Sequence, residues 1–146
     1  MSLLSIILLF SLILLVLLSG FLSGSETAIT ATSKARIVSK IKKGSSRASY
    51  VLRILNKKDS VITSLLLSNN LVNILASSLA TAFLYDIFGF SGIFYATILM
   101  TIILVIFAEV LPKTYSINKP TRTALRISPI IFYLNKFLFP FVYLIN

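Results

Sequence analysis

The stretch Ile87–Ala108, IFGFSGIFYATILMTIILVIFA, contains no charged side chain, and Glu109 follows it directly in the segment EVLPKT of residues 109–114. A run of about 20 apolar residues is long enough to cross a bilayer as a helix. A carboxylate at the end of such a run is costly in lipid, and by default it marks an ion or substrate pathway. The alternative is a helix that ends at the membrane surface with Glu109 in water. We favour the first interpretation, in which Glu109 belongs to an ion or substrate pathway.

Three other apolar segments complete the chain and predict an all-α membrane protein. We expect a single transporter domain over residues 1–146, with transmembrane helices at about 3–31, 60–85 and 88–111. Short cytoplasmic amphipathic helices are expected at about 34–58, with a break at Gly44. The last segment, about 120–146, is rich in aromatic residues and carries a lysine and two prolines. It predicts a juxtamembrane helix lying in the interface, with a fourth crossing as the alternative.

The distribution of Lys and Arg predicts the orientation. The net charge is +10, yet no basic residue precedes Lys34. That absence argues against a cleaved signal peptide. Basic residues gather in 34–58 and again in 113–126. By the positive-inside rule, the N-terminus lies outside and the C-terminus in the cytoplasm of a multi-pass protein of the cell (inner) membrane. The basic segments are expected to contact membrane lipid, with an ordinary solvated charge run as the alternative, and we expect no nucleic acid.

The composition also narrows the chemistry. The chain has no cysteine and no histidine, so zinc, copper and thiolate-bound iron are not expected. The spans offer neither a paired carboxylate nor a nucleophile with a base, and we therefore expect no enzyme.

Two further polar clusters interrupt the apolar spans. Ser19 and Ser23 are four residues apart and share a helix face, and Gly20 and Gly24 permit close helix approach. Glu26 falls on the same face as Ser19. Helix packing without a bound ion is the simpler explanation of this motif taken alone.

The second cluster consists of Asn69, Asn70 and Asn73, inside the expected second span. Amide oxygens are good ligands for hard cations. Interhelical hydrogen bonding is an equally weighted alternative. In the Glu109 segment, Pro112 has no N–H, so the Ala108 carbonyl loses its α-helical partner and is expected to be a further ligand.

All three clusters fall at a similar depth, toward the cytoplasmic ends of their spans. Hydroxyl, amide, carbonyl and carboxylate are all hard oxygen donors, which suit Mg²⁺, Ca²⁺, Mn²⁺ or Na⁺. We therefore expect one cation site between the three helices. The donor types alone do not select magnesium.

The same motifs resemble the transmembrane domain of the CorC/CNNM magnesium transporter family. The likeness rests on Ser19-Gly20 with Ser23-Gly24-Ser25-Glu26, on Asn69-Asn70-Leu71-Val72-Asn73, and on Glu109-Val110-Leu111-Pro112-Lys113-Thr114, and it extends over essentially the whole chain. One departure is Ala108, where the family usually has glycine. Alanine can still supply a backbone carbonyl, with less conformational freedom.

The resemblance implies a homodimer with three spans per subunit that exports Mg²⁺, with Na⁺ as the coupling ion. It maps the metal site onto Ser19, Ser23, the Asn69–Asn73 cluster and Glu109. Relatives continue into a cytoplasmic CBS module that binds ATP, and this module is absent from the sequence. A membrane anchor or ion-sensing scaffold that transports nothing is the alternative function.

Overall fold

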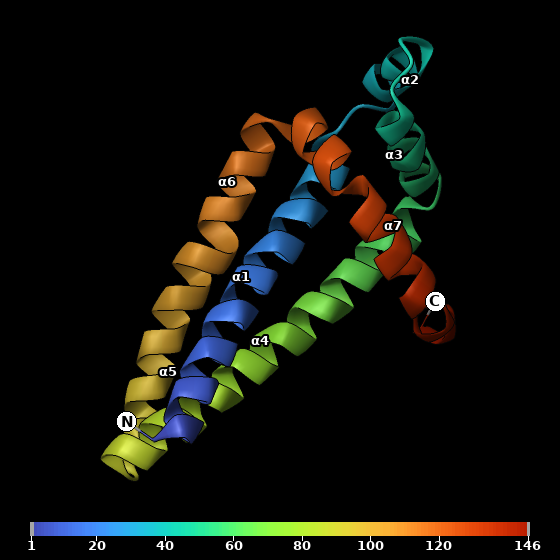
Figure 1. Cartoon of the computed structure of the whole chain (residues 1–146). Coiled ribbons are helices and arrows are strands. Elements are labelled where there is room, and N and C mark those ends of the chain that lie inside the picture. The colour runs from blue at the N-terminus through green and yellow to red at the C-terminus, as the bar shows by residue number, and fades with distance from the viewer. Residues whose placement is uncertain (1, 146) are drawn as a thin grey trace.

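The computed structural model describes residues 2–145, in which every regular element is a helix. The elements in chain order are α1 (Leu3–Ala31), α2 (Lys34–Lys42), α3 (Ser46–Asn56), α4 (Lys58–Phe88), α5 (Ser91–Ile103), the π-helix η1 (Leu104–Val110), α6 (Leu111–Asn118) and α7 (Pro120–Ile145). Because α5, η1 and α6 follow one another without a break, they form one long rod (Figure 1).

The body of the molecule consists of α1, α4 and this rod, with α1 packed against both of the others (Figure 1). Small residues lie where the helices meet: Ala76 and Ala80 of α4 are buried together with Met100 of α5. Small side chains let helix backbones approach closely, which is how helices associate in lipid.

The turn between α4 and α5 depends on Gly92. A Cβ at Gly92 would lie 2.2 Å from the Leu84 carbonyl oxygen, closer than real Cβ atoms come to any neighbour. Gly89 ends α4 with a φ of 71°, a backbone conformation that side-chain-bearing residues rarely adopt. The α4–α5 hairpin therefore requires glycine for its geometry.

The number of helices able to span a membrane differs from the expectation. Four helices in residues 2–145, not three, are long and apolar enough to cross. The fourth is α7, which runs as one helix through Pro129 and Pro140. Apolar and aromatic residues still dominate around the lysine and the prolines, so the mean hydropathy of α7 remains that of an apolar helix. Length and composition therefore leave α7 with the same capacity to cross as the other three.

The helices α2, α3 and α7 form a second layer at one end of the bundle (Figure 1). Ile37, Ala48, Val51 and Ala124 make one buried cluster in this layer. A polar contact fastens α7 to α4, because Ser64 donates a hydrogen bond of 2.9 Å to the Asn135 side-chain oxygen. Both side chains are buried. The layer is thus tied to the bundle by apolar packing and by a hydrogen bond.

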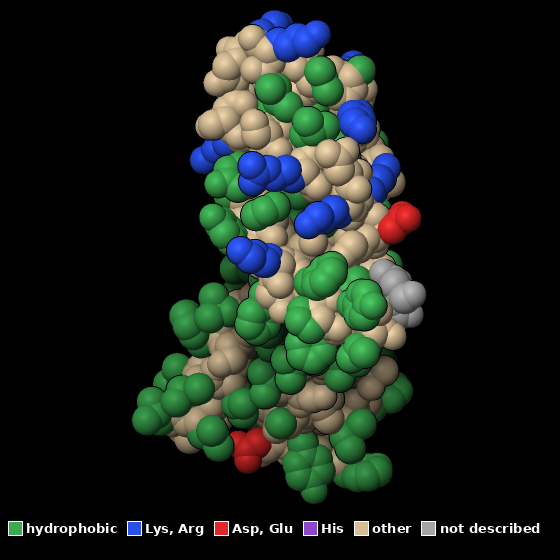
Figure 2. Space-filling model, turned by 90° about the vertical axis from the view of Figure 1, so that its right-hand side faces the viewer, with side chains coloured by type: hydrophobic (Ala, Val, Ile, Leu, Met, Phe, Trp, Pro, Cys, Tyr) green, Lys and Arg blue, Asp and Glu red, His purple; other side chains and the backbone are tan. Residues whose placement is uncertain are grey.

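The surface divides into two parts. Large apolar side chains are exposed along much of α1, α4 and α5, as expected where the solvent is lipid. Figure 2 shows hydrophobic side chains over one half of the visible face and Lys and Arg over the other. This division matches a chain with one half in the bilayer and the basic half at its surface.

Candidate cation site

One face of α1 forms the centre of the site. Ser19 and Ser23 are fully buried, and Gly20 and Gly24 lie against the chain around Pro112. A Cβ at Gly20 would lie 3.2 Å from Pro112 Cγ and 3.3 Å from the Phe107 carbonyl oxygen. The two glycines therefore bring the α1 backbone close to η1 and α6.

The two motifs on α1 and α4 meet at Ser19. Its hydroxyl lies 2.8 Å from the side-chain oxygen of Asn69 and 2.5 Å from that of Asn73. A hydroxyl has one hydrogen to donate, so it can satisfy only one of these oxygens. The other contact sets lone pairs against lone pairs unless that amide turns its NH₂ group inward. With both amide oxygens turned inward, the three oxygens would form a small region of negative potential, which a cation would neutralise.

The hydroxyl of Ser23 supports the same interpretation. It is fully buried and has no hydrogen-bond partner among the described residues. The neighbouring Ser25, also buried, donates to the Phe21 carbonyl at 2.6 Å in the ordinary way for a membrane helix. An orphaned buried hydroxyl costs about 1–3 kcal/mol, so Ser23 has an oxygen free for a ligand.

The third component is the π-helix η1, which the sequence did not predict. The N–H of Leu111 donates to the carbonyl of Ile106, five residues back. In this register the partner of the Phe107 carbonyl would be Pro112, which has no N–H. The Leu111 N–H, which would be the α-type partner of the Phe107 carbonyl, donates to Ile106 instead, and Pro112 offers no π-type partner; the Phe107 oxygen faces Gly20. Single π-turns of this kind occur frequently at functional sites.

Ala108 lies on the same turn and is fully buried. Its Cα would be 3.7 Å from a Cβ at Gly20, so the predicted carbonyl ligand is in the region of the α1 face. Pro112 removes its α-helical partner, as expected from the sequence. Phe107 is the residue that sequence reasoning missed. The sequence signal for Phe107 is Pro112, five residues later. This proline removes a hydrogen-bond partner of Phe107 only when the helix is in the π register.

The remaining predicted residues lie differently. Asn70 is exposed, while Asn69 is buried and Asn73 is half-buried. Glu109 is half-buried and directly follows Ala108. No hydrogen bond joins Asn70 or Glu109 to the Ser19 cluster among the described side chains. The structure thus brings together Ser19, Asn69 and Asn73, with Gly20 against η1.

The charge of the site is low. Within residues 2–145 no group of three or more His, Cys, Asp or Glu side chains could hold a metal ion. Any cation here would be bound mainly by neutral oxygens. The carboxylate of Glu109 directly follows Ala108 in the chain. Mg²⁺ is commonly bound in this way, through few carboxylates and several retained waters.

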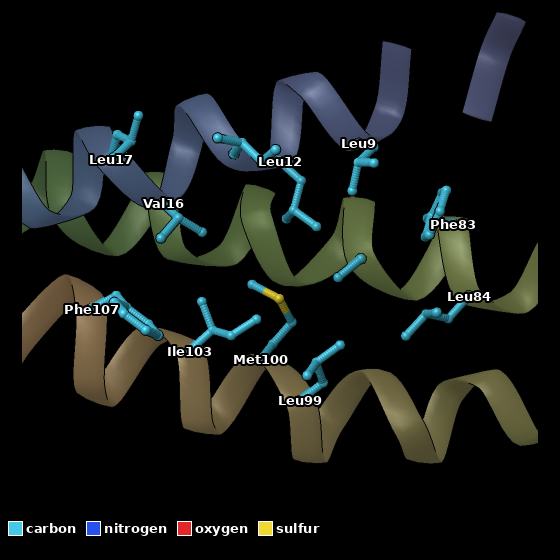
Figure 3. Close-up of a pocket in the computed structure, with 12 residues that line it drawn as sticks. Leu9, Leu12, Val16, Leu17, Phe83, Leu84, Leu99, Met100, Ile103 and Phe107 are labelled. Atoms are coloured by element: carbon cyan, nitrogen blue, oxygen red, sulfur yellow. The ribbon is translucent and has the colours of Figure 1, made fainter. Parts of the chain in front are cut away.

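Toward the N-terminal end of α1, the space between α1, α4 and α5 is apolar. A cavity of about 360 Å³ lies there, and the side chains that line it, including Val16, Met100 and Ile103, are hydrophobic (Figure 3). An ion at Ser19 would meet hydrocarbon on this side. Apolar side chains of this kind do not solvate an ion.

The sequence model of the Cyclin M (CNNM) transmembrane N-terminal domain matches residues 9–146. The chain belongs to this family. It is 37% identical over 129 residues to the UPF0053 inner membrane protein YfjD of Escherichia coli, covering 88% of this chain and 30% of that protein. It is 34% identical over 135 residues to a UPF0053 protein of Haemophilus influenzae, covering 92% of this chain and 32% of that one.

A UPF0053 protein of Synechocystis is 26% identical over 152 residues, covering 94% of this chain and 34% of the relative. The chain therefore spans about a third of the length of the curated relatives it matches. It is a multi-span membrane domain of the CNNM/UPF0053 family.

Proposed function

We propose that this CNNM-family domain exports Mg²⁺ across the cell membrane, with the ion bound between α1, α4 and η1. The observation that carries the proposal is the convergence of the Ser19, Asn69 and Asn73 oxygens beside the orphaned Ser23 hydroxyl. These donors come from separate helices, so a relative movement of the helices would change the coordination.

The chemistry of the donors supports a transported ion. Neutral oxygens exchange for water oxygens around a hard cation at modest net gain, and a site that must release its ion has to bind moderately. Glu109 would supply the charge that favours a cation over an anion. The Phe107 and Ala108 carbonyls would contribute through the π-turn, where helical partners are missing.

The transport cycle would be alternating access. The basic half of the molecule would face the cytoplasm, which places the N-terminus outside. The apolar cavity of Figure 3 would then close the outer side, and helix rocking would open it. We further propose a homodimer and Na⁺ as the coupling ion.

A matched pair of asparagines tests the site. We expect Asn73→Ala to reduce Mg²⁺ efflux from loaded cells strongly, because it removes an oxygen from the Ser19 cluster. Asn70→Ala changes the same residue type on the exposed face and should retain efflux. Glu109→Ala should abolish efflux without loss of the dimer. Equal efflux from the Asn73 and Asn70 variants would contradict the proposed site.

A membrane anchor or ion-sensing scaffold is the second candidate function, because the hydrogen bonds of Ser19 to Asn69 and Asn73 also join α1 to α4 without an ion. A plain anchor would show no selective thermal stabilisation by Mg²⁺ over K⁺. Transport predicts both a selective response and efflux, whereas an ion sensor predicts the response alone.

A further inference from the structure

A polar hollow lies on the outer face of α3, away from the cation site. Ser46, Ser49, Tyr50 and Arg53 line it, and its volume is about 220 Å³. Their spacing of three, four and seven residues places all four on one face of the helix. The hollow offers three hydroxyls and one guanidinium, all of which can donate hydrogen bonds.

Helix α7 holds part of this face in place. The Arg53 guanidinium lies 5.9 Å from the centre of the Phe132 ring, and the Tyr50 ring packs edge-on against Phe132 at 5.5 Å. A guanidinium held over an aromatic ring at this distance is attracted to the ring and keeps its N–H groups free for other acceptors. Arg53 is therefore positioned without its donors being used.

The packing beneath the hollow holds helix α3 in place. Ala48 and Val51 of α3 are buried in the cluster that contains Ala124 of α7, and Ile54 joins the core with Ile131. The buried residues alternate with those that line the hollow. The opposite face of α3 is thus anchored while this one stays open.

The surroundings of the hollow favour an anion. It belongs to the segment Lys34–Lys58, which carries nine of the 14 basic residues. Figure 2 shows that basic side chains cover the half of the molecule that adjoins the hydrophobic half. Phe132 and Tyr133 of α7 stack edge-on at 5.6 Å, and such aromatic side chains favour the headgroup level of a membrane.

We propose that this hollow binds the phosphate of an anionic phospholipid. Arg53 would pair with the phosphate oxygens, the hydroxyls of Ser46 and Ser49 would donate to them, and the rings of Tyr50 and Phe132 would lie against the glycerol and upper acyl region. We assign the phosphate to a lipid and not to a soluble ligand, because two residues that line the hollow, Tyr50 and Arg53, contact Phe132 on the aromatic side of α7. The proposal is independent of ion transport.

The test uses two arginines of the same helix. The full chain, purified in a mild detergent, is titrated with phosphatidylglycerol or phosphatidylcholine, and bound lipids are counted by native mass spectrometry. We expect a preferred phosphatidylglycerol site in the unmodified chain. Arg53→Gln should weaken it about fivefold, the loss expected for one basic residue at a membrane surface. Arg47→Gln, which removes the same charge outside the hollow, should change it less than twofold.

Further variants separate a built site from diffuse charge. The double change Ser46→Ala and Ser49→Ala keeps every charge and should still weaken binding. Arg53→Lys keeps the charge but loses the planar guanidinium over Phe132. Its affinity for phosphatidylglycerol should lie between those of the unmodified chain and Arg53→Gln. Unchanged helical circular dichroism serves as the folding control.

Three results would overturn the proposal. Equal losses in the Arg53 and Arg47 variants would indicate diffuse charge alone. Equal binding of the two lipids would exclude recognition of the headgroup charge. Displacement of the lipid by glycerol phosphate at similar concentration would assign the hollow to a soluble phosphate. Each of these leaves the transport proposal untouched, because none involves Mg²⁺.

Discussion

Replacing Ser23 by alanine should produce opposite effects in the absence and presence of Mg²⁺. The Ser23 hydroxyl is fully buried without a partner among the described residues. Its removal relieves an unmet hydrogen bond and leaves the Cβ in place. At the low end of the usual cost, we expect the ion-free protein to gain about 1 kcal/mol, which corresponds to a rise in Tm of about 2–4 °C.

The magnesium-bound protein should behave differently. At Mg²⁺ about 100-fold above its Kd, a binding site stabilises the folded state by about 2.7 kcal/mol. If the loss of one ligand weakens binding tenfold, the stabilisation falls to about 1.4 kcal/mol at the same concentration. The variant would then start about 1 kcal/mol higher without Mg²⁺ and finish about 0.3 kcal/mol below the unmodified protein with it.

Thermal unfolding in detergent, with and without Mg²⁺, measures both terms. Ser25→Ala is the control, since that hydroxyl is buried but bonded to the Phe21 carbonyl. It should lower the ion-free Tm slightly and keep the full Mg²⁺ shift. If Ser23→Ala destabilises the ion-free protein and keeps the full shift, the Ser23 hydroxyl is part of the packing and not a ligand.

Three other substitutions test the geometry. Pro112→Ala restores an N–H that can pair with the Phe107 carbonyl, so the Mg²⁺-induced Tm shift should fall while helix content stays constant. Asn135→Leu removes the acceptor that joins Ser64 to α7, while the Ser64 hydroxyl keeps the Ser60 carbonyl as an acceptor, so the change should cost about 0.5–1.5 kcal/mol and speed hydrogen exchange in α7 more than in α1. Gly92→Ala would force a Cβ to 2.2 Å from the α4 backbone, so the yield of folded protein should drop sharply; normal yield and Tm would contradict the tight hairpin.

The sequence predicted the helices more readily than the site. The apolar run before Glu109 and the break at Gly44 are local signals. In the structure the run lies within the rod of α5, η1 and α6, which continues past Glu109 to Asn118, and α2 ends before Gly44. The capacity of α7 to cross was underestimated, because its lysine and prolines weighed more in the interpretation than its long apolar stretches.

The site required knowledge of which face of each helix points inward. The sequence predicted Asn69, Asn70 and Asn73 as one cluster, but the structure buries Asn69 and leaves Asn70 exposed. The Ser, Thr and Asn residues of helix α4 are distributed around its circumference, so its sequence has no single polar face that fixes its rotation. The rotation is set by contact with α1, and only then does Ser19 select Asn69 and Asn73.

By itself, the sequence determined that this chain is a helical membrane domain with oxygen donors in three separate segments. Hydropathy and the positions of glycine, proline and charge suffice for that, because they act over one helix length. The tertiary structure alone decided which oxygens converge and that the Phe107 carbonyl faces Gly20. Helix rotation and the π register depend on neighbouring helices, and the energies involved are too small to read from any one segment.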